Sequence, residues 1–331
     1  MLNNKTLLIT GGTGSFGKSF TRYILNKYKR IKKLIIFSRD ELKQYEMQKS
    51  FSKKELDKLR FFLGDIRDKN RLETAFEDVD YIVHAAALKQ VDTAEYNPLE
   101  FVKTNILGSQ NIVDACLKSN VKKVVALSTD KAAAPINLYG ATKLCSDKLF
   151  SAANNVKGKR NISFSLVRYG NVLGSRGSIL STFIEQSKRG SINITDERMT
   201  RFNISMKDAV EMVDWVLRKS IGGEIFVPKL KSFRVIDFAK TLCPKCKINK
   251  IGIRPGEKIH EEMITSSDSY NTFDLNKYYA TVGSYNEKTY KFYSKHRKIN
   301  FENSLNSLDN NFLTKKQLNK IIKKNLYLIN N

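Results

Sequence analysis

The sequence has no long apolar run. No stretch approaches the ~18 consecutive apolar residues of a membrane-spanning helix, and the apolar segment 5–10 is too short for a signal peptide and leads straight into a glycine-rich turn. We therefore expect neither a membrane span nor a membrane partner, and we predict a cytoplasmic protein.

Acidic residues are scarce relative to basic ones, which gives a formal net charge of +25. A charge of this size would suit a nucleic-acid-binding protein. Lysine is spread along the whole chain, however, and no basic block is interleaved with aromatic residues, so nucleic acid is not the expected partner. The charge is better suited to a phosphorylated cofactor and a nucleotide-linked substrate.

Cysteine is also scarce, with four in the chain. Cys116 and Cys145 lie in helix-like stretches, where we expect them to be buried as small apolar residues. Cys243 and Cys246 form a CxxC motif, but a zinc site needs a second pair of ligands, and the neighbouring sequence supplies none. We therefore expect no metal site and interpret the CxxC pair as structurally incidental.

The pattern of apolar residues predicts an α/β fold. With 331 residues and 41% hydrophobic content, the chain can bury the core of one large domain or of two closely joined ones. The expected strands lie at 6–10, 34–37, 60–63, 81–85, 124–128 and 164–167, and the expected helices at 18–29, 98–119 and 138–154. This alternation indicates a Rossmann-type, doubly wound parallel sheet.

The pattern loosens after residue 168. The later expected helices lie at 178–189, 206–219 and 233–242, and a short strand at 224–227 is expected to return to the main sheet. We predict a Rossmann domain at 1–170 with a return of about 203–230, a smaller interleaved substrate-binding part at 171–285, and a weakly patterned tail at 286–331 that ends in a short helix at 315–327.

A glycine-rich turn follows the first expected strand and opens a helix. Small residues there let the backbone approach a pyrophosphate, and the helix N-terminus offers N–H groups and the positive end of a dipole. We therefore predict a dinucleotide site. Its expected contacts are Gly11, Thr13, Gly14, Ser15, Phe16 and Gly17.

The end of the second strand bears on which dinucleotide is bound. An acid at this position suits the ribose 2′-hydroxyl of NAD, whereas a basic group suits the 2′-phosphate of NADP. Ser38 and Arg39 stand near this place and Lys43 follows one turn later, so NADP is favoured. Asp40 is also a candidate ribose ligand, which keeps NAD as the alternative.

Further cofactor contacts are expected after the third, fourth and fifth strands. Asp65 is positioned either to hold the adenine edge or to cap its loop. Ala85, Ala86 and Ala87 are small enough to line the pyrophosphate and ribose. The remaining expected cofactor contacts are Ile66, Lys89, Leu127, Ser128, Val172 and Arg176.

Tyr139 and Lys143 are four residues apart and share one face of a helix. A free phenol has a pKa near ~10, but a nearby cation and a positive nicotinamide would favour the phenolate. Tyr139 would then take a proton from a sugar hydroxyl while hydride leaves the carbon. Ser128 and Thr129 supply the third hydroxyl that this arrangement needs. The alternative is an exposed pair on a helix surface.

Over residues 5–265 the chain resembles the extended short-chain dehydrogenase/reductase family, through its glycine-rich turn, Asp65 and the Tyr139/Lys143 pair. The resemblance implies that Thr129, Tyr139 and Lys143 form a hydride-transfer triad. It also implies a homo-oligomer, a dimer or a hexamer, because the family pairs through the helices expected at 98–119 and 138–154.

The Asp130–Lys131 pair narrows the resemblance. Sugar epimerases of the family usually carry a small and an apolar residue here, and retaining dehydratases carry Asp-Glu. The pair resembles instead the branch that inverts C5 while removing water from UDP-N-acetylglucosamine, at the start of pseudaminic acid biosynthesis. The segments that also resemble this branch are 85–90, 95–100, 168–172, 199–202 and 252–261.

In that branch, oxidation at C4 makes a ketone that acidifies the C5 proton, an acid protonates the departing C6 hydroxyl, and hydride returns to C6. A tightly bound NADP is thereby regenerated in each turnover. We assign Asp130 as the acid and Lys131 as the base at C5, with the division of these roles left open. The base must be a neutral amine, which Asp130 opposes and which burial and the nicotinamide charge favour.

By resemblance, the UDP-sugar is bound by polar and basic residues, and arginine suits its pyrophosphate because it can bind in a bidentate manner. The expected substrate contacts are Lys89, Lys131, Asn171, Arg176, Ile179, Thr195, Arg201, Arg254 and Glu257. His84 and His260 are interpreted as packing or capping residues, since the tyrosine–lysine system needs no imidazole.

Two other functions remain open from the sequence. A UDP-sugar 4- or 5-epimerase would use the same substrate and cofactor, but it has no need to protonate a leaving hydroxyl. A non-catalytic NADP-binding regulator would keep the fold without needing Tyr139 or Lys143, and both are present.

Overall fold

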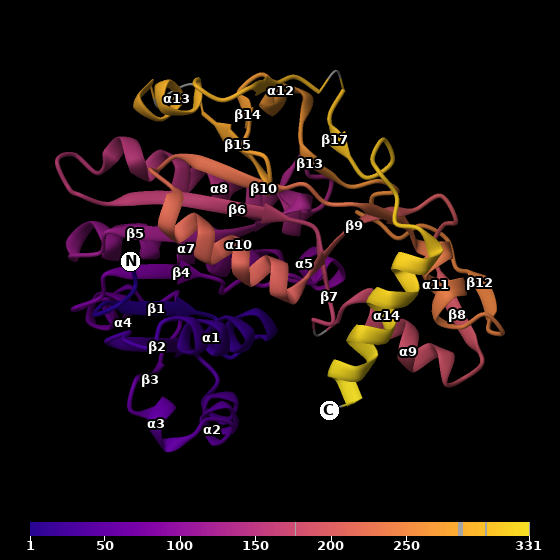
Figure 1. The fold of residues 1–331 in the computed structure, drawn as a ribbon, viewed down its shortest axis with the longest axis horizontal. Coiled ribbons are helices and arrows are strands. Elements are labelled where there is room, and N and C mark those ends of the chain that lie inside the picture. Colours follow the sequence, from indigo (N-terminus) through magenta and orange to yellow (C-terminus); the bar gives the residue numbers. More distant parts are fainter. Residues whose placement is uncertain (176, 284–286, 302, 331) are drawn as a thin grey trace.

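The computed structural model describes residues 1–175, 177–283, 287–301 and 303–330. Its centre is a ten-stranded sheet in the order β16-β14-β15-β10-β6-β5-β4-β1-β2-β3 (Figure 1). The parallel strands are β1 (Thr6–Thr10), β2 (Lys33–Ser38), β3 (Leu59–Leu63), β4 (Tyr81–His84), β5 (Lys123–Thr129), β6 (Ser163–Tyr169) and β10 (Glu224–Pro228). The fold is therefore the Rossmann-type, doubly wound α/β fold that the sequence predicts.

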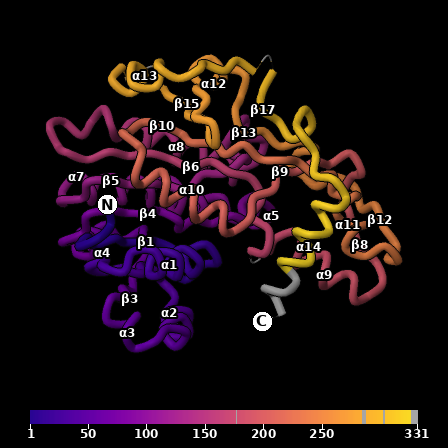
Figure 2. The backbone as a smooth tube through the Cα atoms, in the orientation of Figure 1, coloured from indigo at the N-terminus to yellow at the C-terminus, as the bar shows by residue number. Residues whose placement is uncertain are grey.

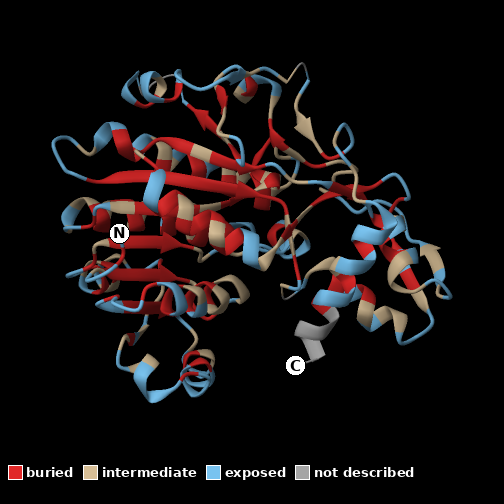
Figure 3. Cartoon of the chain, viewed as in Figure 1, coloured by how far each residue is buried: buried red, intermediate tan, exposed pale blue. Residues whose placement is uncertain are grey.

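Helices cover both faces of this sheet. On one face, α1 (Ser15–Lys27) and α10 (Met206–Lys219) pack Phe20, Ile24 and Val213 into the core. On the other face lie α4 (Lys69–Ala75), α7 (Gly108–Lys118) and α8 (Leu138–Val156), with Ile112 and Phe150 among their buried residues. The central strands are buried almost throughout, as expected for a parallel sheet between two helix layers (Figure 3).

Smaller helices complete the first half of the chain. They are α2 (Glu41–Lys49), α3 (Lys53–Leu56), α5 (Val91–Tyr96), α6 (Pro98–Phe101), the π-helical turn η1 (Val102–Leu107) and the 3₁₀ turn η2 (Asp130–Ala132). The single helix expected at 98–119 is thus divided into α6, η1 and α7. The spacing of apolar residues along the chain gave no sign of the wider π turn η1 between α6 and α7.

The sheet continues beyond β10 with antiparallel strands that the sequence pattern did not indicate. These strands are β15 (Tyr278–Val282), β14 (Thr272–Asp274) and β16 (Lys298–Ile299). Near them lie the short helices α12 (Ser266–Ser269) and α13 (Glu287–Tyr293). Residues that the sequence assigned to a substrate-binding part and to a weakly patterned tail therefore extend the central sheet.

A second, smaller lobe lies beside the carboxyl ends of the parallel strands (Figure 1). Its core contains Phe183, Phe238 and Leu318. Its strands are β7 (Asn171–Leu173), β8 (Ser191–Ile194), β9 (Thr200–Ser205), β11 (Ser232–Arg234) and β12 (Lys247–Lys250), and its helices are α9 (Ile179–Ser187), α11 (Val235–Leu242) and α14 (Lys315–Asn330). A separate pair, β13 (Glu262–Ile264) and β17 (Leu305–Asn306), is antiparallel.

The C-terminal tail crosses the whole molecule. The chain passes from α13 and β16, at the far end of the sheet, through β17 to α14, which packs on α11 in the smaller lobe (Figure 2). The helix expected at 315–327 is present as α14. Among the described residues, no helix combines the length and the apolar character needed to cross a membrane.

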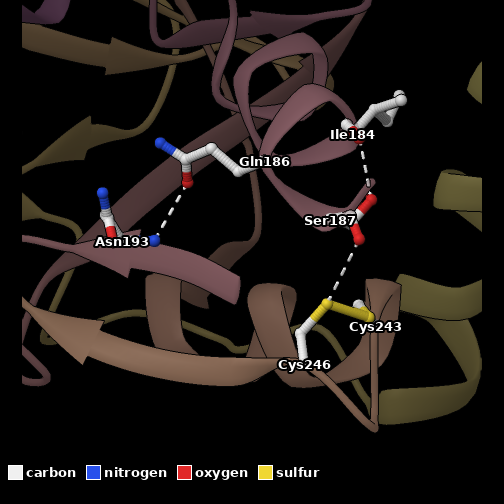
Figure 4. The surroundings of a disulfide bond; sticks show 6 residues. All are labelled: Ile184, Gln186, Ser187, Asn193, Cys243 and Cys246. Atoms are coloured by element: carbon white, nitrogen blue, oxygen red, sulfur yellow. Dashed lines mark hydrogen bonds between the residues drawn. A yellow bond between two sulfur atoms is a disulfide. The ribbon is translucent and has the colours of Figure 1, made fainter. Parts of the chain in front are cut away.

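The cysteines differ in part from expectation. Cys116 is buried as predicted, but Cys145 is exposed on α8, so the prediction of burial at Cys145 was wrong. Cys243 and Cys246 form a disulfide at the end of α11, and Cys246 Sγ lies 3.8 Å from the Ser187 carbonyl oxygen of α9 (Figure 4). Within the described part of the chain, no cluster of three or more His, Cys, Asp or Glu residues could hold a metal ion.

Candidate active site

A cavity of about 1160 Å³ lies between the carboxyl ends of the parallel strands and the smaller lobe. Ligands of doubly wound sheets bind in this position. Asp130, Lys143 and Leu127 do not line the cavity, and Arg176 lies outside the described residues. The predicted residues that line it are Gly11, Thr13, Gly14, Ser15, Phe16, Gly17, Ser38, Arg39, Asp40, Lys43, Asp65, Ile66, Ala85, Ala86, Ala87, Lys89, Ser128, Thr129, Lys131, Tyr139, Asn171, Val172, Ile179, Thr195, Arg201, Arg254 and Glu257.

The glycine-rich turn forms one end of the cavity. Gly11 has φ +65°, and a Cβ atom there would lie 2.9 Å from the Ala86 backbone. A Cβ on Gly17 would lie 2.3 Å from the Gly12 carbonyl oxygen. No side chain caps α1 at Gly14. The close packing at Gly11 and Gly17 therefore requires glycine at these two positions. The turn also presents a helix N-terminus to the cavity, which suits a dinucleotide pyrophosphate.

The end of β2 bears the charges that would select the ribose substituent. Asp40 caps α2 by accepting from the Lys43 N–H (3.0 Å), and its carboxylate also pairs with the Lys43 ammonium. The hydrogen bond from Lys43 lowers the pKa of Asp40. Arg39 lies 3.8 Å from Asp65 and is more than half exposed. Asp40 is thus already engaged by Lys43, while the Arg39 guanidinium is accessible at the cavity edge.

Tyr139 lies in the first turn of α8, directly above η2. Asn137 caps this helix by accepting from the Gly140 N–H (2.7 Å). The absence of a side chain at Gly140 lets α8 pack against η2, because a Cβ there would lie 2.2 Å from the Lys131 carbonyl oxygen. The sequence thereby brings Tyr139 next to the Thr129–Lys131 segment.

Burial opposes the phenolate that the sequence suggested for Tyr139. It raises the pKa of Tyr139 to about 12, although the Lys131 charge and the hydrogen bond with Thr129 act in the opposite direction. Lys143 is buried, donates to the Leu127 carbonyl (2.8 Å), and has its pKa lowered by burial. Burial therefore favours the phenol over the phenolate at Tyr139, and Lys143 is held in place by the Leu127 carbonyl.

Asp130 and Lys131 lie at the end of β5 with a third charged residue, Glu261. Asp130 Oδ1 accepts from Thr129 Oγ1 (2.9 Å) and from Lys131 Nζ (3.2 Å), and Lys131 Nζ also lies 3.0 Å from Glu261 Oε1. Asp130 and Glu261 are 1% and 2% exposed. The sequence motif included Glu261, but no local spacing indicated that it would meet Lys131.

The electrostatics of this group support the role of Asp130 as an acid and oppose the role of Lys131 as a base. Burial raises the pKa of Asp130, in spite of the Lys131 charge, which suits a general acid. Burial alone would lower the pKa of Lys131, but the charges of Asp130 and Glu261 outweigh it and raise the pKa above its ordinary value. The neutral amine required of Lys131 as a base is therefore disfavoured in this structure.

A buried ion pair lies beneath the site. Ser128 Oγ donates to Asp147 Oδ2 (2.7 Å), and Arg168 Nη2 lies 3.1 Å from the same oxygen. Arg168 also donates to the Met263 carbonyl (3.1 Å). These contacts tie β5, β6, α8 and β13 together, and so fix the strand ends that carry the acid–base residues.

The predicted substrate residues of the smaller lobe form one connected group. Arg201 donates to the Ile259 and Lys258 carbonyls (each 3.0 Å), and Arg254 lies 3.2 Å from both Glu257 and Asp92. These contacts order the loop 252–261, and both arginines line the cavity.

The two histidines within the predicted site region have the packing roles expected of them. His84 Nδ1 lies 2.8 Å from Thr10 Oγ1, and burial lowers the pKa of His84 to about 3. His260 Nδ1 lies 2.8 Å from Thr200 Oγ1, and burial likewise lowers the pKa of His260. Both are neutral at physiological pH, and neither lines the cavity.

The Rossmann-type sheet, the glycine turn and the Tyr139–Lys143 helix define an extended short-chain dehydrogenase/reductase. Within that class, the chain belongs to the polysaccharide biosynthesis protein family, whose family model matches residues 7–282.

The chain is similar both to a sugar-nucleotide dehydratase and to a sugar-nucleotide epimerase. The chain is 54% identical over 282 residues, 85% of its length and 83% of the relative's, to the inverting UDP-N-acetylglucosamine 4,6-dehydratase of Campylobacter jejuni. It is 42% identical over 286 residues, 84% and 83% of the two chains, to a UDP-glucose 4-epimerase of Rickettsia canadensis. The X-ray structure of Pen from Bacillus thuringiensis matches with a TM-score of 0.90 and 34% identity, covering 98% of both chains.

Proposed function

We propose that this chain is an inverting UDP-N-acetylglucosamine 4,6-dehydratase, a hydro-lyase that forms a 6-deoxy-4-keto sugar nucleotide. The observation that carries the proposal is the Asp130–Lys131 pair beside Tyr139, directly after β5, in which Asp130 is buried and Lys131 lines the cavity. An acid is needed here only if a hydroxyl leaves. The 54% identity to a dehydratase of that name over most of both chains supports the same function.

The residues divide between two chemical steps. Bound NADP would supply hydride acceptance from C4 and hydride return to C6. For C4 oxidation, Tyr139 takes the proton of the sugar hydroxyl as a phenolate, the form that the positive nicotinamide of bound NADP would favour, with Thr129 hydrogen-bonded to it and Lys143 held on the Leu127 carbonyl. For loss of water, Asp130 protonates the C6 hydroxyl and Lys131 takes the C5 proton. Return of a proton to the opposite face inverts C5.

The cofactor proposed is NADP, with NAD as the alternative. Arg39 is accessible at the cavity edge, and Asp40 is bound by Lys43, so the local charge favours a 2′-phosphate over a free ribose hydroxyl. An Arg39→Ala variant should bind NADP more weakly and NAD about as well as the parent, measured by fluorescence titration. Equal weakening for both cofactors would contradict this assignment.

The remaining assignments belong to the same proposal. We place the product in pseudaminic acid biosynthesis, the protein in the cytoplasm, and the assembly as a homo-oligomer paired through α7 and α8. We likewise propose a cofactor domain at 1–170 with a return of about 203–230, and a substrate part drawn from 171–285, on the position of the cavity between the sheet and the smaller lobe. Strands β14, β15 and β16, from the substrate part and the tail, extend the sheet of the cofactor domain.

A UDP-sugar 4-epimerase is the alternative, because a relative with that name shares 42% identity. The two functions are separated by incubating the protein with UDP-N-acetylglucosamine and measuring product mass. A dehydratase gives a product lighter by one water molecule, whereas an epimerase gives a product of unchanged mass. A product of unchanged mass would overturn the proposed function.

A further inference from the structure

Glu261 is the one carboxylate of the Asp130–Lys131–Glu261 group that no step of the proposed reaction uses. It lies one residue before β13, 2% exposed, with its Oε1 atom 3.0 Å from Lys131 Nζ. Unlike Asp130, Glu261 lines the cavity together with Lys131. A buried acid in contact with the reactive amine needs either a structural or a chemical reason to be there.

The structure holds Glu261 firmly in this position. Its backbone N–H donates to Ser307 Oγ (2.9 Å), and its carbonyl accepts from the Ser307 N–H (2.8 Å). Ser307 is fully buried, and its Oγ also lies 2.6 Å from Thr200 Oγ1. The C-terminal tail and β9 thus fix the backbone of Glu261.

The side chain of Glu261, by contrast, is only partly satisfied. Oε1 faces Lys131 and lies 3.7 Å from Arg201 Nε, while Oε2 is buried without a hydrogen-bond partner in the described part of the chain. Asp130 Oδ2 is unpartnered in the same way. Leaving a buried carboxylate oxygen unpaired is costly, which argues against a purely structural group.

We propose that Glu261 acts through Lys131 as its proton acceptor: it takes the ammonium proton so that the amine can take the C5 proton. This role rests on the proposed dehydration. The Lys131 N–H bond breaks as an O–H bond forms on Glu261 Oε1. The neutral amine then removes the C5 proton, the C6–O bond breaks, and Asp130 supplies the proton that completes water.

The proposal gives the charged Lys131 a proton acceptor within hydrogen-bond distance. Asp130 and Glu261 together raise the pKa of Lys131. Burial alone would raise the pKa of Glu261, but the charges of Lys131 and Arg201 lower it, so the resting site holds an ion pair. Transfer of the ammonium proton to Glu261 converts this ion pair into a neutral amine and a neutral acid, which low-dielectric surroundings penalise less than water would. The proton that Lys131 took from C5 then passes to Asp130, whose Oδ1 lies 3.2 Å from Lys131 Nζ, and Glu261 returns its proton to the amine. A solvent proton delivered to the opposite face of C5 completes the inversion.

The test compares Glu261→Gln with Glu262→Gln, a matched control on the adjacent strand residue, which does not line the cavity. In Glu261→Gln, we expect dehydration at neutral pH to fall by ~100-fold, as for loss of an acid–base group. Reduced nicotinamide should accumulate after substrate is added, because C4 oxidation does not use Glu261. The rate should recover as pH rises, since Lys131 then loses its proton to solvent.

Several results would overturn the proposal. One is an unchanged rate and pH profile in Glu261→Gln, and another is an equal loss of activity in Glu262→Gln. A third is loss of C4 oxidation together with dehydration in Glu261→Gln, which would indicate a structural role for Glu261. A Glu261→Asp variant, which keeps the carboxylate, should recover part of the activity.

A second readout is independent of the substrate and separates this proposal from the proposed function. Lysines are labelled by reductive ¹³C-methylation, and the Lys131 signal is assigned from its absence in Lys131→Arg. Lys131 should titrate at lower pH in Glu261→Gln than in the parent, whether or not UDP-N-acetylglucosamine is dehydrated. An unshifted titration would overturn the pairing of Glu261 with Lys131.

Discussion

At the scale of single residues, the chemistry of this site depends on how buried charges are shared. Asp130, Lys131 and Glu261 place two carboxylates around one ammonium, and all three are held within 3.2 Å contacts. Burial favours the protonated form of Asp130, while the two carboxylates favour the protonated form of Lys131. Asp130 is thus shifted toward the protonated form that an acid needs, whereas Lys131 is shifted away from the neutral form that a base needs.

Replacing Lys131 by alanine should stop dehydration without disturbing the cofactor site. We expect NADP binding to be retained and turnover to fall by ~100-fold or more, because general base catalysis is lost. The measurement is steady-state product formation, with NADP binding measured in parallel. Lys148→Ala, an exposed lysine on α8, is the control. Turnover near that of the parent in Lys131→Ala would remove Lys131 from the mechanism.

The sequence could predict the residues that act as local motifs. The glycine turn, Asp130–Lys131 and the Tyr139/Lys143 pair each lie within a few residues of one another, so spacing and residue type were enough to identify them. Glu261 could not be found in this way, because it meets Lys131 only when β13 packs beside η2. The protonation of Tyr139 and Lys131 was likewise unpredictable, since it follows from burial and from this distant carboxylate.

At the scale of secondary-structure elements, the site depends on how closely α8 approaches η2. Gly140 makes this approach possible, because a Cβ at residue 140 would lie 2.2 Å from the Lys131 carbonyl oxygen. That oxygen belongs to the backbone, so it cannot move aside as the end of a flexible side chain could. The helix must therefore move if residue 140 gains a side chain. Such a movement separates Tyr139 from Thr129 and Lys131.

A Gly140→Ala variant should therefore lose activity while its helix propensity improves. We expect turnover to fall by ~100-fold, because displacement of a catalytic group by about 1 Å has an effect of this order. Gly283→Ala is the control, because a Cβ at Gly283 meets no atom within 4 Å. Normal turnover with unchanged thermal stability in Gly140→Ala would show that the spacing of α8 and η2 does not matter.

Helices α1 and α10 are joined by one buried carboxylate, Asp214, whose side chain is 0% exposed. Burial alone would raise its pKa, but hydrogen bonds from Lys27 and Tyr28 and the charge of Arg218 lower it below the ordinary value. A lowered carboxyl pKa contributes stability above the pKa of the unfolded chain, and this stability is lost as pH falls through the folded-state pKa.

An Asp214→Asn variant should accordingly be less stable at pH 7, by ~2–4 kcal/mol, because buried donors lose a charged partner. Its free energy of unfolding should also depend less on pH below about 4. Urea unfolding at pH 7 and at acidic pH measures both effects. Asp237→Asn, on the exposed side of α11, is the control and should show neither. The same pH dependence of the free energy of unfolding in the parent and in Asp214→Asn would refute this account.

At the scale of the whole molecule, the tail is part of the working structure. Strands β14, β15 and β16 extend the central sheet, Ser307 supports Glu261, and α14 packs in the smaller lobe. The sequence did not indicate these additional strands, because β14 and β16 have only three and two residues and all three strands lie outside the alternation of strands with helices. The parallel core was predictable because its strands are apolar and separated by helices.

The proton NMR spectrum of the reaction with UDP-N-acetylglucosamine in D₂O tests the central claim most directly. We predict a new C6 methyl signal, deuterium at C5, and couplings of the L-arabino configuration. A methyl signal with C5 retained would keep the dehydratase but contradict inversion through Lys131. A C4 epimer without a methyl signal would contradict the account and favour the epimerase.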